Sequence, residues 1–197
     1  MMNDISQIIN KAYNFLYIQY KQIDRGTEIT INGRIKYFGK KGRLCIGNNT
    51  IINSGPYYIP IGFSGYTSFW IMGDGYITIG NSCGISNVAF CSQSKIQIGN
   101  NVLIGGGVKI YDTDFHSLDY IERRNIHKDK NRSSDPVVID DDVFIGAGSF
   151  ILKGTHIGAR SIIGAGSVVT GKIPSDEIWA GNPAKFIGKI KCYSKSK

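Results

Sequence analysis

The 197-residue sequence predicts an all-β solenoid, a parallel β-helix built from six-residue repeats. Aliphatic residues recur at every sixth position over 139–169, a spacing that neither an α-helix nor a flat strand requires. A small or β-branched residue lies four positions after most of these aliphatics, and glycine often follows them directly. Three hexapeptides would close one triangular coil of about 18 residues, and stacked coils would bury the aliphatics in a continuous core. The aliphatic column comprises Ile79, Ile85, Ile98, Ile104, Ile110, Ile139, Ile145, Ile151, Ile157, Ile163 and Val169.

Residues 1–26 are expected to form an N-terminal helical cap. Apolar residues spaced by three and four positions run from Ile5 to Ile23, which indicates an amphipathic helix. Asp4 is the candidate N-cap residue, and Gly26 is the candidate stop. Two interpretations of the apolar stripe remain open, because it could cap the end of the solenoid core or lie weakly on a membrane surface.

The β-helix is expected to occupy residues 27–178, with one interruption. Ile110 should be followed by an aliphatic at the next repeat position, but His116 stands there, and the repeat returns only at Ile139. The residues between are mostly polar, charged and aperiodic, so the sequence predicts a loop over 117–136 that leaves the solenoid. Long loops in compact domains are usually functional or disordered.

Composition narrows the class of protein. The formal net charge of +8 favours anionic ligands, but the basic clusters are not interleaved with aromatic residues, so nucleic-acid binding is not expected. No segment has the pattern of a signal peptide or of 18 continuous apolar residues, and the four cysteines lack the paired spacing of a metal site. A cytoplasmic protein with reduced thiols is therefore expected.

The repeat resembles that of a known enzyme family. Each unit reads Ile or Val, then Gly, two variable residues, a small residue and a variable residue, most regularly over 98–186. The closing segment and basic tail, 179–197, begin with WAGNPAKFI. Together these features resemble the hexapeptide-repeat acyltransferases, and among them the sugar and polysaccharide O-acetyltransferases. The resemblance implies a left-handed β-helix, acetyl-CoA as co-substrate without a metal, and a homotrimer with active sites between subunits.

His116 is the candidate catalytic base, because a hydroxyl must lose its proton to attack a thioester, and neutral imidazole can take that proton. From the residues alone, His116 could equally replace a core aliphatic where a coil ends; the family places its catalytic histidine at this junction. Asp112 and Asp114 are candidate substrate-binding residues at the loop root, where one of them could orient the imidazole ring, or both could form turn bonds. His156 is expected to face outward, and His127 could touch an acceptor. Nothing places the three histidines on one edge of the coil, so no metal site is expected.

The donor site is predicted from periodicity. Ala147 and Ala165 are 18 residues apart, one full coil, and Phe144 is related to Ile162 in the same way. Such positions should stack into a smooth edge with accessible backbone groups. This edge could bind the thin pantetheine arm of coenzyme A, or the alanines could simply let the coil turn, and both can hold together.

The family resemblance assigns further roles along this edge. It implies that Phe144 packs against the pantetheine arm and that the Ala147 N–H is an oxyanion donor. It implies that Asn87 contacts the acceptor, although Asn87 could also be a simple corner asparagine. The remaining candidates for coenzyme binding lie near the end of the repeat and are Thr170, Lys172 and Lys185. The charges of the two lysines suit the phosphates of coenzyme A.

The resulting expectation is an O-acetyltransferase that moves the acetyl group of acetyl-CoA to a carbohydrate hydroxyl, on a surface polysaccharide or its precursor. N-acetylation of a nucleotide-linked amino sugar, or acetylation of an antibiotic, is the alternative on the same machinery. A non-enzymatic β-solenoid would need a regular outer face, such as columns of threonine, and the sequence lacks one.

Overall fold

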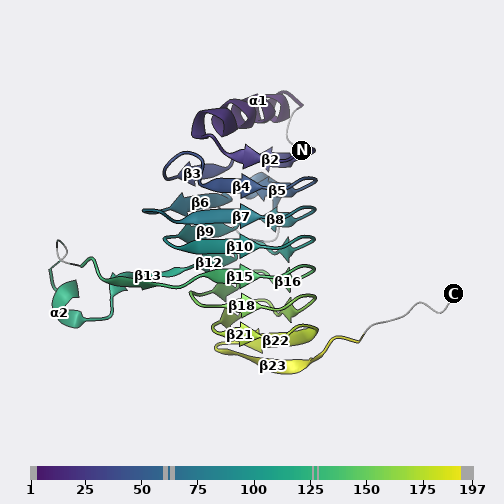
Figure 1. Cartoon of the computed structure of the whole chain (residues 1–197). Coiled ribbons are helices and arrows are strands. Elements are labelled where there is room, and N and C mark those ends of the chain that lie inside the picture. The colour runs from purple at the N-terminus through teal and green to yellow at the C-terminus, as the bar shows by residue number, and fades with distance from the viewer. Residues whose placement is uncertain (1–3, 60–61, 63–64, 126, 128, 192–197) are drawn as a thin grey trace.

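The protein is a left-handed parallel β-helix whose open N-terminal end is covered by one helix (Figure 1). The computed structural model describes residues 4–59, 62, 65–125, 127 and 129–191. The chain winds through three parallel sheets in turn, here called A, B and C. One coil takes one strand from each sheet, so a coil has an A/B corner, a B/C corner and a C/A corner.

The strands of the three sheets are short, as tight corners require. Sheet A contains β1 (Asp24–Arg25), β4 (Leu44–Ile46), β7 (Tyr76–Ile79), β10 (Lys95–Ile98), β15 (Val137–Ile139), β18 (His156–Ile157) and β21 (Lys172–Ile173). Sheet B contains β2 (Thr30–Gly33), β5 (Ile51–Ser54), β8 (Gly84–Ser86), β11 (Leu103–Ile104), β16 (Phe144–Ile145), β19 (Ile162–Ile163), β22 (Glu177–Gly181) and the antiparallel β23 (Ala184–Lys189). Sheet C contains β3 (Lys36–Phe38), β6 (Ser68–Ile71), β9 (Ala89–Ser92), β12 (Lys109–Tyr111), β17 (Phe150–Ile151) and β20 (Val168–Val169).

The core is the predicted aliphatic column, and every member of it is buried. The register of the sheets stacks these side chains directly, as Ile104 on Ile145 and Ile145 on Ile163. The second set of small residues lies inside the corners, where hydroxyls satisfy corner carbonyls. Thr155 Oγ1 donates to the Val169 carbonyl at 3.2 Å, and Ser167 Oγ donates to Gly164 at 2.6 Å. The six-residue period therefore reflects one inward aliphatic and one inward small residue per side.

A ladder of polar side chains holds the A/B corners together. Asn48 Oδ1 accepts the Thr27 N–H at 2.8 Å, and Asn81 Oδ1 accepts the Asn48 N–H at 2.7 Å. Asn100 Oδ1 then accepts the Asn81 N–H at 2.9 Å, and Asp141 Oδ1 accepts the Asn100 N–H at 2.6 Å. Each oxygen thus pairs a corner N–H that the strands leave without a partner.

Helix α1 (Asp4–Lys21) lies across the first coil, but not with the face that the apolar pattern suggested. Ile18 is buried against the core, and Asn14 Nδ2 donates to the Gly33 carbonyl at 2.7 Å. The open edge of a β-solenoid presents unpaired backbone groups, which polar side chains can satisfy and aliphatic ones cannot. Most of the predicted apolar stripe therefore faces outward, and Ile23, which follows the helix, is its buried member. The helix also ends at Lys21, where Gln22 takes a positive φ of 52°, rather than at Gly26.

The C-terminal end closes with a hairpin. Strand β22 pairs with β23, and the rings of Trp179 and Phe186 meet edge to face at 6.3 Å between centroids. Cys192 and the rest of the predicted basic tail beyond residue 191 lie outside the described residues. No described helix has the length and apolar character needed to cross a bilayer.

Candidate functional site

The predicted loop is an arm that leaves the solenoid at the C/A corner between β12 and β15 (Figure 1). It contains β13 (Thr113–Ser117), the short helix α2 (Tyr120–Arg123) and β14 (Arg132–Ser134), with the two strands antiparallel. The arm begins at Thr113, earlier than the predicted 117, because β13 already pairs with β14 rather than with a neighbouring coil. His116 therefore belongs to the arm and not to the coil core.

The root of the arm is fixed from two sides. Lys153, from the next coil, lies 3.1 Å from Asp114 Oδ2 and donates to Ser133 Oγ at 3.0 Å. Phe115 packs its ring against Tyr111 and Trp70 on the outer face of sheet C, with centroid distances of 5.1 and 6.1 Å. These contacts hold both strands of the arm near the solenoid and so position His116, which lies on β13.

His116 is oriented by a carboxylate that sequence reasoning missed. Its Nδ1 lies 2.5 Å from Asp129 Oδ2, and Asp129 Oδ1 accepts the Ser117 N–H at 2.7 Å. The Ser117 hydrogen bond, followed by that to His116, lowers the pKa of the Asp129 carboxyl, so the group is ionised at neutral pH. A carboxylate acceptor selects the tautomer with the proton on Nδ1. The Nε2 lone pair is then available on an imidazole that is 67% exposed.

The two carboxylates that precede the histidine have other partners. Asp112 is fully buried and accepts from Ser92 Oγ at 2.7 Å and from the N–H groups of Gln93 and Ser94 at 2.7 and 2.9 Å. Asp114 is paired with Lys153. Neither group lies against His116 among the described contacts, and the hydrogen bonds of Asp112 reach the neighbouring coil rather than forming a turn at the entrance of the arm. Asp129 lies in the aperiodic arm, and no spacing or motif in the sequence singled it out.

Asp112 also affects a neighbouring thiol. Burial, and then the nearby Asp112 charge, raise the pKa of Cys91 to about 12. The thiol is 2% exposed and stacks in register with Tyr111. Cys91 is therefore protonated and inaccessible at neutral pH, which excludes it as a nucleophile in this conformation.

The predicted donor edge is a column of small residues at the B/C corner. Ala147 and Ala165 follow the paired strands β16 and β19 at equivalent positions, and Gly166 donates its N–H to the Ala147 carbonyl at 2.8 Å. The Ala147 N–H donates to no acceptor within the described part of the chain. A Cβ on Gly146 would lie 2.4 Å from the Ala165 nitrogen, so this corner is too tight for any residue but glycine. The edge is therefore smooth, and the Ala147 N–H is available to donate a hydrogen bond to a ligand.

Asn87 stands in the same corner column, two coils from Ala147. It follows β8 as Ala147 follows β16, so the two lie about 10 Å apart along the solenoid axis. Asn48 and Asn100 share its repeat position but lie at the A/B corner. Asn87 is buried, and its Oδ1 accepts the Gly55 N–H at 2.8 Å, which ties it to the segment that follows β5.

Phe144 lies beside this column on the outer face of sheet B. It is 44% exposed and stacks in register between Leu103 and Ile162. A hollow of about 180 Å³ on this face is lined by Phe144, Leu103 and Asn53, among others. The face therefore offers an apolar surface next to the backbone groups of the corner.

The other coenzyme candidates divide between two corners. Thr170 follows β20 at the C/A corner, two coils below the arm root, and Lys172 begins the strand β21 of sheet A. Lys185 in β23 pairs with Ala180 beside the B/C corner. Within one chain, His116 and Thr170 thus lie on one flank of sheet C, and Ala147 and Ala165 lie on the other.

The other two histidines are surface residues. His156 is exposed as expected, with Nε2 3.0 Å from Asp140 Oδ2, and His127 is exposed in the arm. No group of three or more His, Cys, Asp or Glu side chains suitable for a metal ion occurs within the described ranges.

Comparison with known proteins agrees with this architecture. The family described as bacterial transferase hexapeptide (six repeats) matches residues 136–171. Residues 136–171 therefore contain hexapeptide repeats of the kind found in these transferases. The chain is similar to a Schizosaccharomyces pombe protein named as an acetyltransferase, with 41% identity over 53% of this chain and 48% of the relative. It is also similar to galactoside O-acetyltransferase of Lactococcus lactis, with 35% identity over 53% of this chain and 48% of that protein. The hexapeptide-repeat chain spans about half the length of these relatives.

Solved structures extend the similarity to most of the hexapeptide-repeat chain. Galactoside acetyltransferase in complex with coenzyme A is 27% identical, with a TM-score of 0.52 over 85% of this chain and 65% of that chain. A hexapeptide-repeat acetyltransferase from Vibrio cholerae is 26% identical, with a TM-score of 0.54 over 89% and 79%. The N-acyltransferase AntD from Bacillus cereus has a TM-score of 0.72 over 91% and 90% at 21% identity, which establishes the shared fold alone.

Proposed function

We propose that the protein is an O-acetyltransferase that moves the acetyl group of acetyl-CoA to a hydroxyl of a carbohydrate. The observation that carries this proposal is the His116–Asp129 pair on an arm rooted at a corner of a hexapeptide-repeat solenoid. An exposed imidazole with a charged carboxylate behind it has the arrangement of a general base. The similarity to galactoside O-acetyltransferase and to a coenzyme A complex supports the donor and the acceptor class.

The reaction follows from these groups. Nε2 of His116 takes the proton of the acceptor hydroxyl as its oxygen attacks the acetyl carbonyl carbon. The oxyanion that forms accepts a hydrogen bond from the Ala147 N–H. Collapse of the intermediate breaks the carbon–sulfur bond, and the proton on the imidazole passes to the departing thiolate. The products are an acetyl ester and free coenzyme A.

The site is proposed to form between subunits of a trimer. His116 and the Ala147 edge lie at the two corners that flank sheet C, so one chain does not bring them together. The outer face of sheet C exposes Phe38, Trp70 and Phe150, which is apolar surface that a neighbour can cover. In a cyclic trimer with sheet C facing the axis, the C/A corner of one subunit meets the B/C corner of the next.

In this arrangement, two neighbouring subunits contribute different candidate residues to one coenzyme site. One subunit supplies the smooth edge of Ala147 and Ala165, with Phe144 beside the pantetheine arm. The next supplies His116 and, below it, Thr170 and Lys172. Lys185, beside the edge, adds a further positive charge near the coenzyme phosphates. The donor thus lies along the interface with its thioester near the arm root.

The acceptor is proposed to extend along the same corner toward the N-terminal end. Above Asn87, a hollow of about 340 Å³ is lined by Tyr57, Tyr58 and Tyr66 together with Arg34. Tyrosine rings present flat apolar faces with polar edges, and these suit the faces and hydroxyls of sugar rings. The Gly55–Asn87 hydrogen bond joins this hollow to the corner column.

The test is acetyl transfer from acetyl-CoA to a panel of sugars, nucleotide sugars, amino sugars and aminoglycosides, read by product mass and by ester-specific hydroxylamine cleavage. A hydroxylamine-sensitive gain of one acetyl group on a sugar supports the proposal. An acetyl group on an amine that resists hydroxylamine would instead show that the protein is an N-acetyltransferase. Absence of both transfer and coenzyme A binding would favour a non-enzymatic solenoid.

A further inference from the structure

Helix α1 turns its apolar side away from the protein. Its inward side carries Asn14, Tyr17 and Ile18, and only Ile18 of these is a buried aliphatic. The outward side carries a row of large apolar side chains, here called the cap stripe, each between 38% and 69% exposed. The cap stripe consists of Ile5, Ile8, Ile9, Tyr13, Leu16 and Tyr20, and the half-exposed Phe15 continues it around the side of the helix toward the first coil. So large a row on one helix indicates an interaction surface rather than scattered exposed residues.

The same end of the molecule also carries an excess of positive charge. Residues 1–45 contain eight of the 23 Lys and Arg residues but only three of the 15 Asp and Glu residues. Several of these cations lie over aromatic rings of the cap stripe. Lys41 Nζ is 4.6 Å from the centre of the Tyr20 ring, and the Arg34 guanidinium is 4.6 Å from that of Tyr13. The cap stripe is therefore bordered by cations that are held in place.

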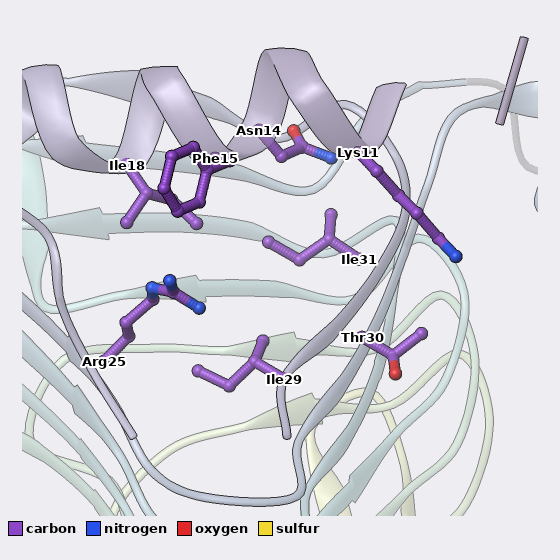
Figure 2. A pocket seen from close by; sticks show the side chains of 8 residues that line it. All are labelled: Lys11, Asn14, Phe15, Ile18, Arg25, Ile29, Thr30 and Ile31. Carbon is purple, nitrogen blue, oxygen red and sulfur yellow. The ribbon is translucent and has the colours of Figure 1, made fainter. Parts of the chain in front are cut away.

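A hollow beneath α1 continues this surface (Figure 2). It has a volume of about 320 Å³, and Figure 2 shows Phe15 and Ile18 of the helix above Ile29 and Ile31 of the first coil. Lys11 stands at one edge with its charged end pointing away from the hollow, and the Arg25 guanidinium at the other side turns toward the Phe15 ring, 5.9 Å from its centre. The hollow repeats the chemistry of the stripe, with an apolar interior between two cations.

We propose that the α1 end docks on the surface of an anionic phospholipid bilayer, with the helix lying in the plane of the interface. Amphipathic helices with cations beside an apolar face bind in this way, and the apolar residues enter the boundary between headgroups and acyl chains. A second copy is the other possible occupant of the stripe. Two such ends face to face would bring two positively charged surfaces together, whereas anionic headgroups neutralise the charge.

The test is flotation of the full chain with vesicles of phosphatidylcholine alone or with phosphatidylglycerol. The wild type should float with the anionic vesicles and much less with the neutral ones. Lys11→Gln/Lys41→Gln should weaken binding roughly 25-fold, because each cation near an anionic surface contributes about fivefold. Ile9→Asp should weaken it by about tenfold or more, since it removes an inserted side chain and adds a negative charge.

Matched variants at the opposite end serve as controls. Ile187→Asp in β23 makes the same substitution as Ile9→Asp at another exposed isoleucine. Lys189→Gln/Lys191→Gln removes the same number of positive charges as the double lysine variant. Both should bind like the wild type, and all variants should keep the wild-type melting temperature. Equal binding to both vesicle types, no flotation, or equal losses at the two ends would overturn the proposal. So would a doubling of the light-scattering mass that Ile9→Asp abolishes, because that result would assign the stripe to a second copy.

Discussion

Single residues determine how the arm can act as a base. Asp129 fixes the tautomer of His116, and the Ser117 N–H fixes Asp129. Lys153 contacts both arm strands, at Asp114 in β13 and at Ser133 in β14. The chain of contacts runs from the solenoid to Nε2 through side chains that are either buried or paired. The imidazole itself remains exposed, as the proposed role of a base for a ligand held by a neighbouring subunit requires.

Removal of the base should abolish most of the activity. His116→Ala should lower the rate of acetyl transfer by about 10²-fold or more, the usual contribution of a general base. The melting temperature should change little, because the exposed ring buries little surface. Steady-state kinetics and a thermal melt on the same preparation check both statements. Near-wild-type turnover in a folded variant would refute the assignment.

Asp129 should behave as a positioning residue. In Asp129→Asn the amide oxygen can still accept from Ser117, but the NH₂ group then faces Nδ1 and favours the tautomer with its proton on Nε2. We expect kcat to fall by about 10- to 10²-fold with a small change in KM for acetyl-CoA. Asp129→Glu should restore part of the loss. A rise in KM with an unchanged kcat would show that Asp129 acts in binding instead.

The lowered pKa of Asp129 also predicts a change in stability with pH. A carboxyl whose pKa is lower in the folded state stabilises that state above its unfolded pKa, near 3.8 for Asp, and this contribution is lost as pH falls through the folded value. Denaturant unfolding of the wild type between pH 7 and pH 3 should therefore show a loss that begins only below about pH 4. Asp129→Asn should lack that part of the loss, and identical pH curves would contradict the prediction.

At the scale of elements, corners rather than strands determine where ligands can lie. The strands repeat the same inward aliphatic, while each corner differs in what it offers. The A/B corner is closed by the ladder of asparagines, the C/A corner carries the arm, and the B/C corner is bare backbone. Function is thus expected at the two corners that the repeat leaves open or interrupts.

The tightness of the B/C corner can be measured. In Gly146→Ala the new methyl group would lie 2.4 Å from the Ala165 nitrogen, and a backbone atom in a stacked coil cannot move aside easily. We expect the free energy of unfolding to fall by about 1–3 kcal/mol. Gly188→Ala is the matched control, because no atom lies within 4 Å of its Cβ, and it should stay within about 0.5 kcal/mol of wild type. Equal effects in urea unfolding would contradict this account of the corner.

A larger residue on the donor edge should block the coenzyme without harming the fold. Ala165 is exposed, so Ala165→Tyr should fill the space of the pantetheine arm and leave the melting temperature nearly unchanged. Calorimetric titration of coenzyme A should give binding to the wild type and little or none to the variant. Equal binding in both would refute the donor edge, and binding in neither would favour a solenoid without an enzyme activity.

The sequence predicts some of these elements and not others, for physical reasons. Ile145 and Ile163 reveal the coil because packing repeats at every turn, and Ala147 and Ala165 follow from the same period. Asp129 does not follow, since the arm has no repeat and its fold depends on contacts far along the chain. The apolar spacing of α1 correctly predicts a helix, but spacing alone does not say which side meets the core. The backbone groups at the open edge of the first coil require polar partners such as Asn14, so the polar side of the helix faces the core end.

At the scale of the whole molecule, the proposed function requires that the two open corners meet between subunits, because one chain keeps them on opposite flanks of sheet C. A chain of this mass should form a stable trimer, and light scattering should give about three times 21.7 kDa at working concentration. A monomer under the conditions in which the enzyme is active would contradict an intersubunit site. Trp70→Glu, on the outer face of sheet C, should weaken the trimer, because that face is expected to line its axis.

Subunit complementation tests the central claim most directly. His116→Ala keeps the donor edge and loses the base, while Ala165→Tyr keeps the base and loses the edge. In mixed trimers assembled from equal amounts of these two inactive chains, about a quarter of the interfaces should pair an intact base with an intact edge, if assembly is random. The mixture should therefore recover up to about a quarter of wild-type activity. No recovery from mixed trimers of confirmed composition would show that each site lies within one chain and would contradict the account.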